Sequence, residues 1–270
     1  MASVIIYYYT GTGNSLFAAR QLQEALGDAR LAPMAAWLGA GDRPPEAEAV
    51  GLVYPICQTA MPLPVRHFLK RLRLAPTVYR FALATRIGTS HSAFATADRL
   101  LARQGRRLDL WGNVNMASND PKFDYQVPTE EQLARLEQAA CAEIRQLAKK
   151  INRREVWRPK DNTATLRIPG VALLEPLVLA AWKRPVKLYS DGGCTGCGLC
   201  AAVCPAGRIR LEAGRPRWQS DIPCWQCSAC LSYCPAQAVQ LKGFTEKNGR
   251  YPHPYATAEE IGAQRALAGR

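Results

Sequence analysis

The sequence predicts an α/β protein with a doubly wound parallel sheet, followed by a small α+β module rich in cysteine. Strands that look buried alternate with helices over the first 150 residues, a pattern typical of a parallel sheet covered on both faces. A glycine-rich turn joins the first strand to the first helix. Eight of the ten cysteines lie within residues 191–241, in a block that repeats itself with an offset of 30 residues. The length of 270 residues and the 48% apolar content suit two soluble domains and exclude a disordered chain.

The alternation can be followed element by element. We predict strands over residues 4–9, 49–54, 80–85 and 107–114, each a short run rich in apolar residues. Helices are predicted over residues 16–26, 65–74, 93–104 and 129–151, where apolar residues recur at helical spacing. Thr129 and Gln132 form a capping-box pattern at the start of the longest helix, and Thr257 and Glu260 form another in the tail.

Composition divides the chain into four segments. Residues 1–152 are predicted to form the α/β domain, 153–190 a basic connector, 191–242 the cysteine module, and 243–270 a tail with a short helix. The connector contains an apolar stretch at 168–182, which is interrupted by two prolines, a glycine and a glutamate. We expect this stretch to pack against the protein, because a membrane-spanning helix needs about 20 largely apolar residues.

The cysteine module contains two complete copies of one pattern, C-x2-C-x2-C-x3-C-P, beginning at Cys194 and at Cys224. This pattern is typical of proteins that hold two [4Fe-4S] clusters, in which the fourth cysteine of each copy ligates the other cluster. The sequence therefore predicts two crossed ligand sets: Cys194, Cys197, Cys200 and Cys234 for cluster 1, and Cys224, Cys227, Cys230 and Cys204 for cluster 2.

Zinc ribbons and disulfide scaffolds are the alternatives for such a block. Zinc sites usually combine two separated pairs of cysteines. A disulfide scaffold would imply secretion, and residues 1–9 have neither the basic region nor the cleavage pattern of a signal peptide. Outside the module, Cys141 is predicted to be a small buried side chain within a helix. Cys57 follows a strand and is either a structural thiol or a reactive thiol near a ligand.

The glycine-rich turn has the sequence Thr10-Gly11-Thr12-Gly13-Asn14-Ser15. Its position between a buried strand and a helix allows backbone amides and the helix N-terminus to hold a phosphate. The lysine of a nucleotide triphosphatase loop is absent, and Leu16 replaces the third glycine of the dinucleotide fingerprint. The turn therefore predicts a phosphate site of another kind.

This turn at the head of an α/β domain, followed by the double cysteine pattern, resembles the flavodoxin–ferredoxin fusion family over nearly the whole chain. The resemblance implies a flavodoxin-like domain with strand order 2-1-3-4-5 and FMN bound where the order reverses. It implies that Thr10 to Ser15 hold the FMN phosphate and that three loops surround the flavin ring. The candidate residues of those loops are Tyr54, Pro55, Ile56, Cys57 and Met61, then Thr85, Arg86, Ile87, Gly88 and His91, and finally Asn119.

One of these residues marks a departure from flavodoxins, and two leave alternatives open. Tyr54 is the one aromatic residue in the first two loops, so the ring would be less enclosed than in many flavodoxins. Arg86 either stabilises a reduced flavin by its charge or lies in solvent. His91 is either a donor at the flavin edge or a solvated loop residue.

Together these features predict an iron–sulfur flavoprotein that passes electrons between two [4Fe-4S] clusters and FMN, linking one-electron carriers to a two-electron partner or substrate. An alternative is a pure electron carrier that delivers low-potential electrons to a larger enzyme. No catalytic acid–base group is evident.

The net charge is +13, and residues 1–150 and 151–190 each contribute +5. We expect this charge to serve an acidic redox partner, such as a ferredoxin or flavodoxin, and not nucleic acid. A cytoplasmic location is expected, and peripheral membrane contact stays open.

Overall fold

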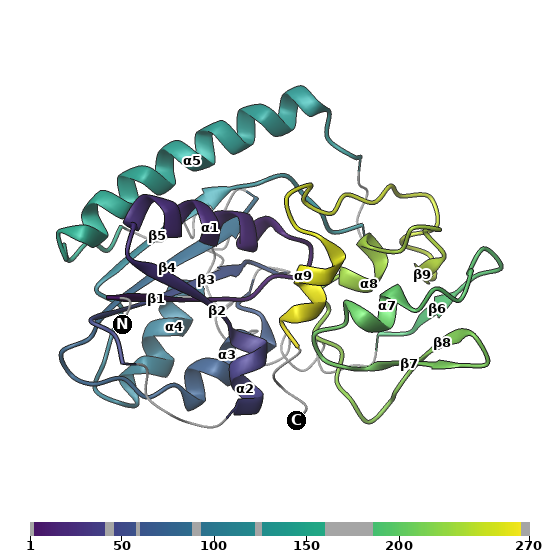
Figure 1. The fold of residues 1–270 in the computed structure, drawn as a ribbon, viewed down its shortest axis with the longest axis horizontal. Coiled ribbons are helices and arrows are strands. Elements are labelled where there is room, and N and C mark those ends of the chain that lie inside the picture. The colour runs from purple at the N-terminus through teal and green to yellow at the C-terminus, as the bar shows by residue number, and fades with distance from the viewer. Residues whose placement is uncertain are drawn as a thin grey trace, which may run out of the picture.

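A computed structural model describes residues 3–40, 46–57, 60–87, 93–121, 126–159 and 186–265. Its main sheet has five parallel strands in the order β2-β1-β3-β4-β5 (Figure 1). This is the order that the resemblance implied, so the predicted fold class is confirmed. The strands are β1 (Val4–Tyr8), β2 (Ala29–Pro33), β3 (Ala49–Pro55), β4 (Tyr79–Arg86) and β5 (Leu110–Asn115).

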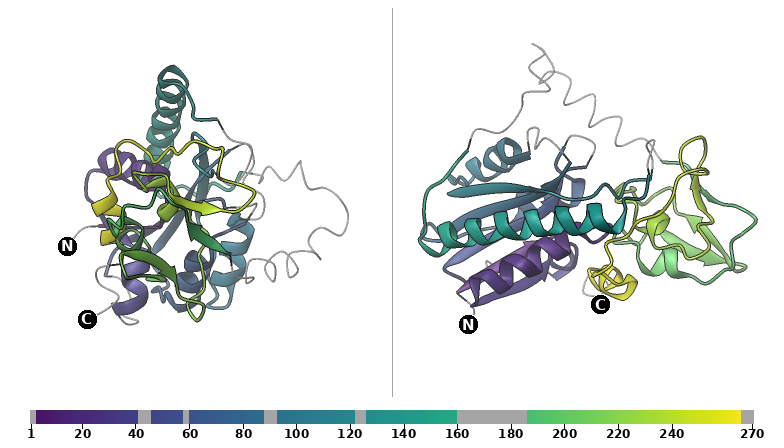
Figure 2. Two further views of the ribbon diagram at one scale, coloured as in Figure 1. Left: turned by 90° about the vertical axis from the view of Figure 1, so that its right-hand side faces the viewer. Right: turned by 90° about the horizontal axis from the view of Figure 1, so that it is seen from above.

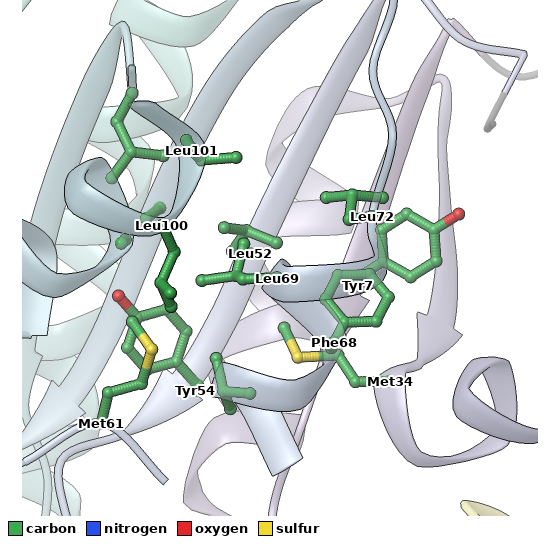
Figure 3. Packing of buried hydrophobic residues seen from close by; sticks show 14 of the residues in the cluster. Tyr7, Met34, Leu52, Tyr54, Met61, Phe68, Leu69, Leu72, Leu100 and Leu101 are labelled. Atoms are coloured by element: carbon green, nitrogen blue, oxygen red, sulfur yellow. The ribbon is translucent and has the colours of Figure 1, made fainter. Parts of the chain in front are cut away.

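Helices cover both faces of the sheet (Figure 2). One face carries α1 (Asn14–Leu26) and α5 (Glu130–Asn152); the other carries α2 (Met34–Ala40), α3 (Leu63–Arg71) and α4 (Ala93–Ala102). Side chains alternate along β1, so that Ile5 and Tyr7 pack in the core beneath α3, while Val4 and Ile6 pack beneath α1. Figure 3 shows the core beneath α3. Every strand of this sheet is thus buried from both sides or lies at an edge.

One strand and one helix were missed by the sequence analysis. The edge strand β2 is only partly buried, includes Arg30 and ends at Pro33, so it has no continuous apolar run. Helix α2 follows it directly and has seven residues. Both predicted capping boxes are confirmed, because the side chains of Thr129 and Thr257 accept from the backbone N–H of Gln132 and Glu260.

The cysteine module is built from two short antiparallel strand pairs and two short helices. The strand β6 (Leu188–Ser190) pairs antiparallel with β9 (Val239–Leu241), and β7 (Ile209–Glu212) pairs antiparallel with β8 (Arg215–Trp218). The helices α7 (Leu199–Ala202) and α8 (Ala229–Ser232) contain Cys200 and Cys230. They are related by the 30-residue offset of the repeat, so the duplication seen in the sequence is a duplication of structure.

The predicted connector and tail are partly integrated into the domains. Trp157 donates its backbone N–H to the Asp109 carbonyl and accepts from the Trp111 N–H, so it extends the edge of β5. The α/β domain therefore continues beyond residue 152. The predicted packing stretch at 168–182 lies outside the described residues. In the tail, α9 (Ala258–Ala263) lies between the sheet domain and the cysteine module (Figure 1). None of the described helices is long and apolar enough to cross a membrane.

Candidate functional site

The eight cysteines of the module line two separate cavities. Cys194, Cys197, Cys200 and Cys234 surround one, and Cys204, Cys224, Cys227 and Cys230 surround the other. These are the two crossed sets that the sequence predicts. In the described residues no three His, Cys, Asp or Glu side chains converge as a single metal ion would require. Each set instead encloses a space, which is the arrangement that a multi-atom cluster needs.

The environment of these thiols suits iron ligation. Burial raises the pKa of Cys200 to about 11 and that of Cys227 to about 12. A thiolate at either position therefore needs positive charge beside it, and iron supplies that charge. The backbone N–H of Gln226 also points toward the Cys224 sulfur, at 3.4 Å. The cysteines and their backbone donors fit two [4Fe-4S] clusters.

A third cavity, of about 210 Å³, lies at the carboxyl ends of β1, β3, β4 and β5. Parallel α/β sheets bind ligands at this edge, next to the strand where the order reverses. Most of the predicted flavin residues line it: Thr10, Gly11, Thr12, Asn14, Ser15, Pro55, Ile56, Cys57, Thr85, Arg86, Ile87 and Asn119. Arg86 is half-buried and lines the cavity, and its charge also acts on Glu143 of α5.

The polar groups of this cavity are arranged for a ligand. Helix α1 begins at Asn14 and has no acidic residue in its first turn, so its positive end can attract an anion at the cavity, although Asp120 also lines that cavity. The hydroxyls of Ser15 and Thr85 lie 2.7 Å apart. Asn14 Oδ1 and Asn119 Nδ2 are buried and have no hydrogen-bond partner among the described residues. Buried polar atoms without a partner are rare in proteins, so these two atoms fit a bound polar ligand such as FMN.

Three predicted flavin residues lie elsewhere. Tyr54 and Met61 are fully buried in the core beneath α3 and α4 (Figure 3), because the strand alternation turns Tyr54 toward that core together with Leu52. Gly13 faces the tail, where a Cβ would lie 2.6 Å from the His253 Cβ. The cavity therefore has no aromatic side chain from the loop after β3. Gly88 and His91 lie outside the described residues.

The cluster 2 cavity and the α/β cavity share one wall. Gln226, Cys227 and Ser228 line both of them. The phosphate loop touches this wall directly, since a Cβ built on Gly11 would lie 2.1 Å from the Cys227 carbonyl oxygen. The hydroxyl of Ser228 donates to the Asp120 carboxylate at 3.1 Å, which joins the wall to the loop after β5.

The shared wall was missed by sequence reasoning, which assigned Cys227 to cluster 2 alone. Tyr9 and Asp120 also line the α/β cavity and were not predicted. One signal for the wall was present in the repeat: where the first copy has Gly196 and Gly198, the second has Gln226 and Ser228. The two copies therefore differ at the positions that face the α/β cavity.

The tail fastens the phosphate loop from the other side. Gln264 is fully buried; its side chain accepts from the Thr10 N–H and donates to the Thr10 carbonyl, both at 3.1 Å. The N–H of His253 donates to the Thr12 carbonyl at 2.8 Å, and its ring stacks on Phe17 with the centroids 4.6 Å apart. Burial lowers the pKa of His253 to about 4, so this ring is neutral at neutral pH. The tail thereby fixes the backbone of two loop residues.

The comparisons with known proteins assign the cysteine module. Residues 193–242 match the family model of the 4Fe-4S dicluster domain. The chain therefore joins an α/β domain with the strand order of flavodoxins to a region that matches the 4Fe-4S dicluster domain. The dicluster domain matched by this model includes all eight predicted ligand cysteines and both hairpin strands β7 and β8.

The flavodoxin-like domain is similar to several solved structures at low identity. A Trp repressor binding protein from Bacillus subtilis is 13% identical, with a TM-score of 0.38, and the match covers 54% of this chain and 97% of that one. A flavodoxin from the domain Archaea is 13% identical, with a TM-score of 0.32, and covers 54% and 98%. An azoreductase from Bacillus anthracis is 11% identical, with a TM-score of 0.38, and covers 56% and 100%. No curated protein matches the chain. The fold of this domain is defined by its own strand order.

Proposed function

We propose that this fusion is an iron–sulfur flavoprotein that moves electrons between two [4Fe-4S] clusters and FMN. The observation that carries the proposal is the wall shared by the α/β cavity and the cluster 2 cavity, made of Gln226, Cys227 and Ser228. Electronic coupling falls steeply with distance, so cofactors separated by one layer of residues are well placed to exchange electrons. A reduced cluster releases one electron, while FMN accepts two electrons with protons, which couples one-electron carriers to a two-electron partner or substrate.

The residues of the chain have separable roles in this proposal. The start of α1 and the loop residues that line the cavity (Thr10, Gly11, Thr12, Asn14 and Ser15) hold the FMN phosphate. Asn14 and Asn119 offer a polar acceptor and a polar donor. Arg86 brings a positive charge to the cavity, which favours the reduced flavin. The cysteines of the dicluster domain hold the clusters, and Cys227 lies at the flavin side.

Cofactor content provides the first experiment. We expect anaerobically purified chain to contain about eight iron and eight sulfide ions, as two [4Fe-4S] clusters require, and to bind about one FMN. A reductive titration should then show that both the flavin and the clusters of the same protein sample become reduced. Full iron loading without any FMN binding would leave the pure carrier as the better description, and absence of iron would contradict the proposal outright.

The partner of this chain is proposed to be an acidic redox protein that docks at cluster 1, and not at the basic residues of 1–190 that the charge balance favours. Cys197 is exposed, and Leu211 and Pro216 of the β7–β8 hairpin line the cluster 1 cavity. On the opposite face of the hairpin, Arg210 lies directly across from Arg217. Like charges at directly opposite positions destabilise a hairpin, so these two arginines are better explained by binding to a partner than by stabilisation of the fold. Arg217 lies 3.9 Å from Glu212, and both side chains are largely exposed, so this weak pair leaves the arginines open to an acidic partner surface.

Neutralising these two arginines tests the docking proposal. We expect R210Q/R217Q to slow reduction by an acidic ferredoxin about tenfold at low salt and to weaken its salt dependence, because electrostatic attraction raises association rates. R103Q/R135Q removes the same charge from exposed positions of the flavodoxin-like domain and serves as the control. Reduction by dithionite should be unchanged in both. An equal loss of rate in the control would place docking elsewhere.

A further inference from the structure

Two residues of the cluster 2 loop have a backbone conformation that normally requires glycine. Gln226 has a φ of 54° and Ser228 a φ of 60°. The residues 30 positions earlier, in the first copy of the repeat, are Gly196 and Gly198, with φ of 71° and 78°. Side chains are strained in this region of conformational space, and such strain often marks a functional position. At these two positions the second copy has side chains where the first copy has none.

The surroundings of the two copies explain why they differ. In the first copy, a Cβ at residue 196 would lie 2.6 Å from the Gly214 carbonyl oxygen, so the hairpin excludes a side chain. In the second copy, the corresponding side chains border the α/β cavity. Ser228 is accounted for by its hydrogen bond to Asp120. Gln226 lines the cavity and also presents its backbone N–H to the Cys224 sulfur.

We propose that Gln226 is a flavin-contacting residue that the dicluster domain supplies to the flavodoxin-like domain. The inference rests on the proposed function, since it takes the ligand of the cavity to be FMN. A carboxamide both donates and accepts hydrogen bonds, and the flavin ring carries carbonyl oxygens and an N–H along one edge. The same residue lies against a cluster 2 ligand, so the flavin site is complete only when the two domains are docked.

A pair of matched glycine variants tests this inference. Gln237 has a φ of 48°, is exposed, and corresponds to Gly207 in the first copy, whose φ is 65°. Q226G and Q237G therefore remove the same side chain from the same backbone conformation, and both should keep or raise the thermal stability of the cluster-loaded, FMN-free protein. Only Q226G is expected to weaken FMN binding, by about tenfold, which is the effect of losing one good hydrogen bond.

The readouts are the dissociation constant of FMN, from fluorescence quenching, together with iron content and melting temperature. Weaker FMN binding in Q226G, with full iron content and undiminished stability, supports a direct contact. Unchanged FMN binding in Q226G, or equal weakening in Q237G, would overturn the inference and leave the proposed function standing. Failure of the wild-type chain to bind FMN would overturn both. The flavin reduction potential is measured as well. Its value in Q226N, which keeps a shorter carboxamide, should lie between those of wild type and Q226G.

Discussion

Replacing Cys204 by alanine is expected to remove cluster 2 and leave cluster 1 intact. Cys204 belongs by sequence to the first copy of the repeat, but it lines the cavity of Cys224, Cys227 and Cys230. Loss of one thiolate ligand should release that cluster and about half of the iron. Because cluster 2 shares its wall with the flavin cavity, the variant should also lose electron exchange with FMN.

The mirror substitution gives the opposite pattern. C234A should lose cluster 1, also about half of the iron, while cluster 2, reduced photochemically before FMN is added, still passes its one electron to the flavin. Iron analysis, electron paramagnetic resonance of the reduced protein and flavin absorbance report these outcomes. C141A is the control, because Cys141 is half-buried on α5 with its thiol donating to Gln21, far from the module in sequence. If C204A spared flavin reduction and C234A abolished it, the crossed ligation would be wrong.

Replacing Gly11 by alanine should disrupt the contact between the two domains. The added Cβ would lie 2.1 Å from the Cys227 carbonyl oxygen and 2.8 Å from the Cys227 Cβ. Neither atom can rotate away, so the phosphate loop and the cluster 2 loop must separate. Such overpacking typically costs about 1–3 kcal/mol of folding free energy. We expect lower thermal stability, weaker FMN binding and slower electron transfer, with iron content retained.

Gly192 provides the matched control for this substitution. Among the described residues, no atom outside its immediate neighbours lies within 4 Å of a Cβ built there, and its φ is not in the left-handed region. G192A should therefore match the wild type in melting temperature, FMN affinity and electron-transfer rate. Wild-type electron transfer in G11A would mean that the two loops do not form the route between the cofactors.

Much of the fold was predictable because its determinants are local. Apolar runs marked the buried strands, and the capping boxes at Thr129 and Thr257 marked helix starts to the residue. The crossed cysteine sets followed from spacing alone, and the structure gathers those same sets around two cavities. That each of these cysteines ligates its cluster stays a prediction.

The features that escaped prediction depend on contacts between distant segments. The strand β2 is recognised only by its pairing with β1, since its own sequence is mixed. Tyr54 and the cavity residue Pro55 are neighbours, and only the register of β3 decides which of them faces the core. The clamp of Gln264 on Thr10 spans 254 residues. No local sequence pattern reports such a contact. The shared wall did have a signal in the sequence, because Gln226 of the second copy stands where the first copy has Gly196.

The central claim is that the clusters and FMN exchange electrons inside one chain. The most direct test is to reduce the clusters photochemically in FMN-free protein, remove the reductant, and mix the protein with oxidised FMN in a stopped-flow instrument. We predict that flavin absorbance bleaches as the clusters reoxidise, with two cluster electrons consumed for each flavin, and that G11A does so more slowly than wild type. Clusters that stay reduced beside bound, oxidised FMN would contradict the account.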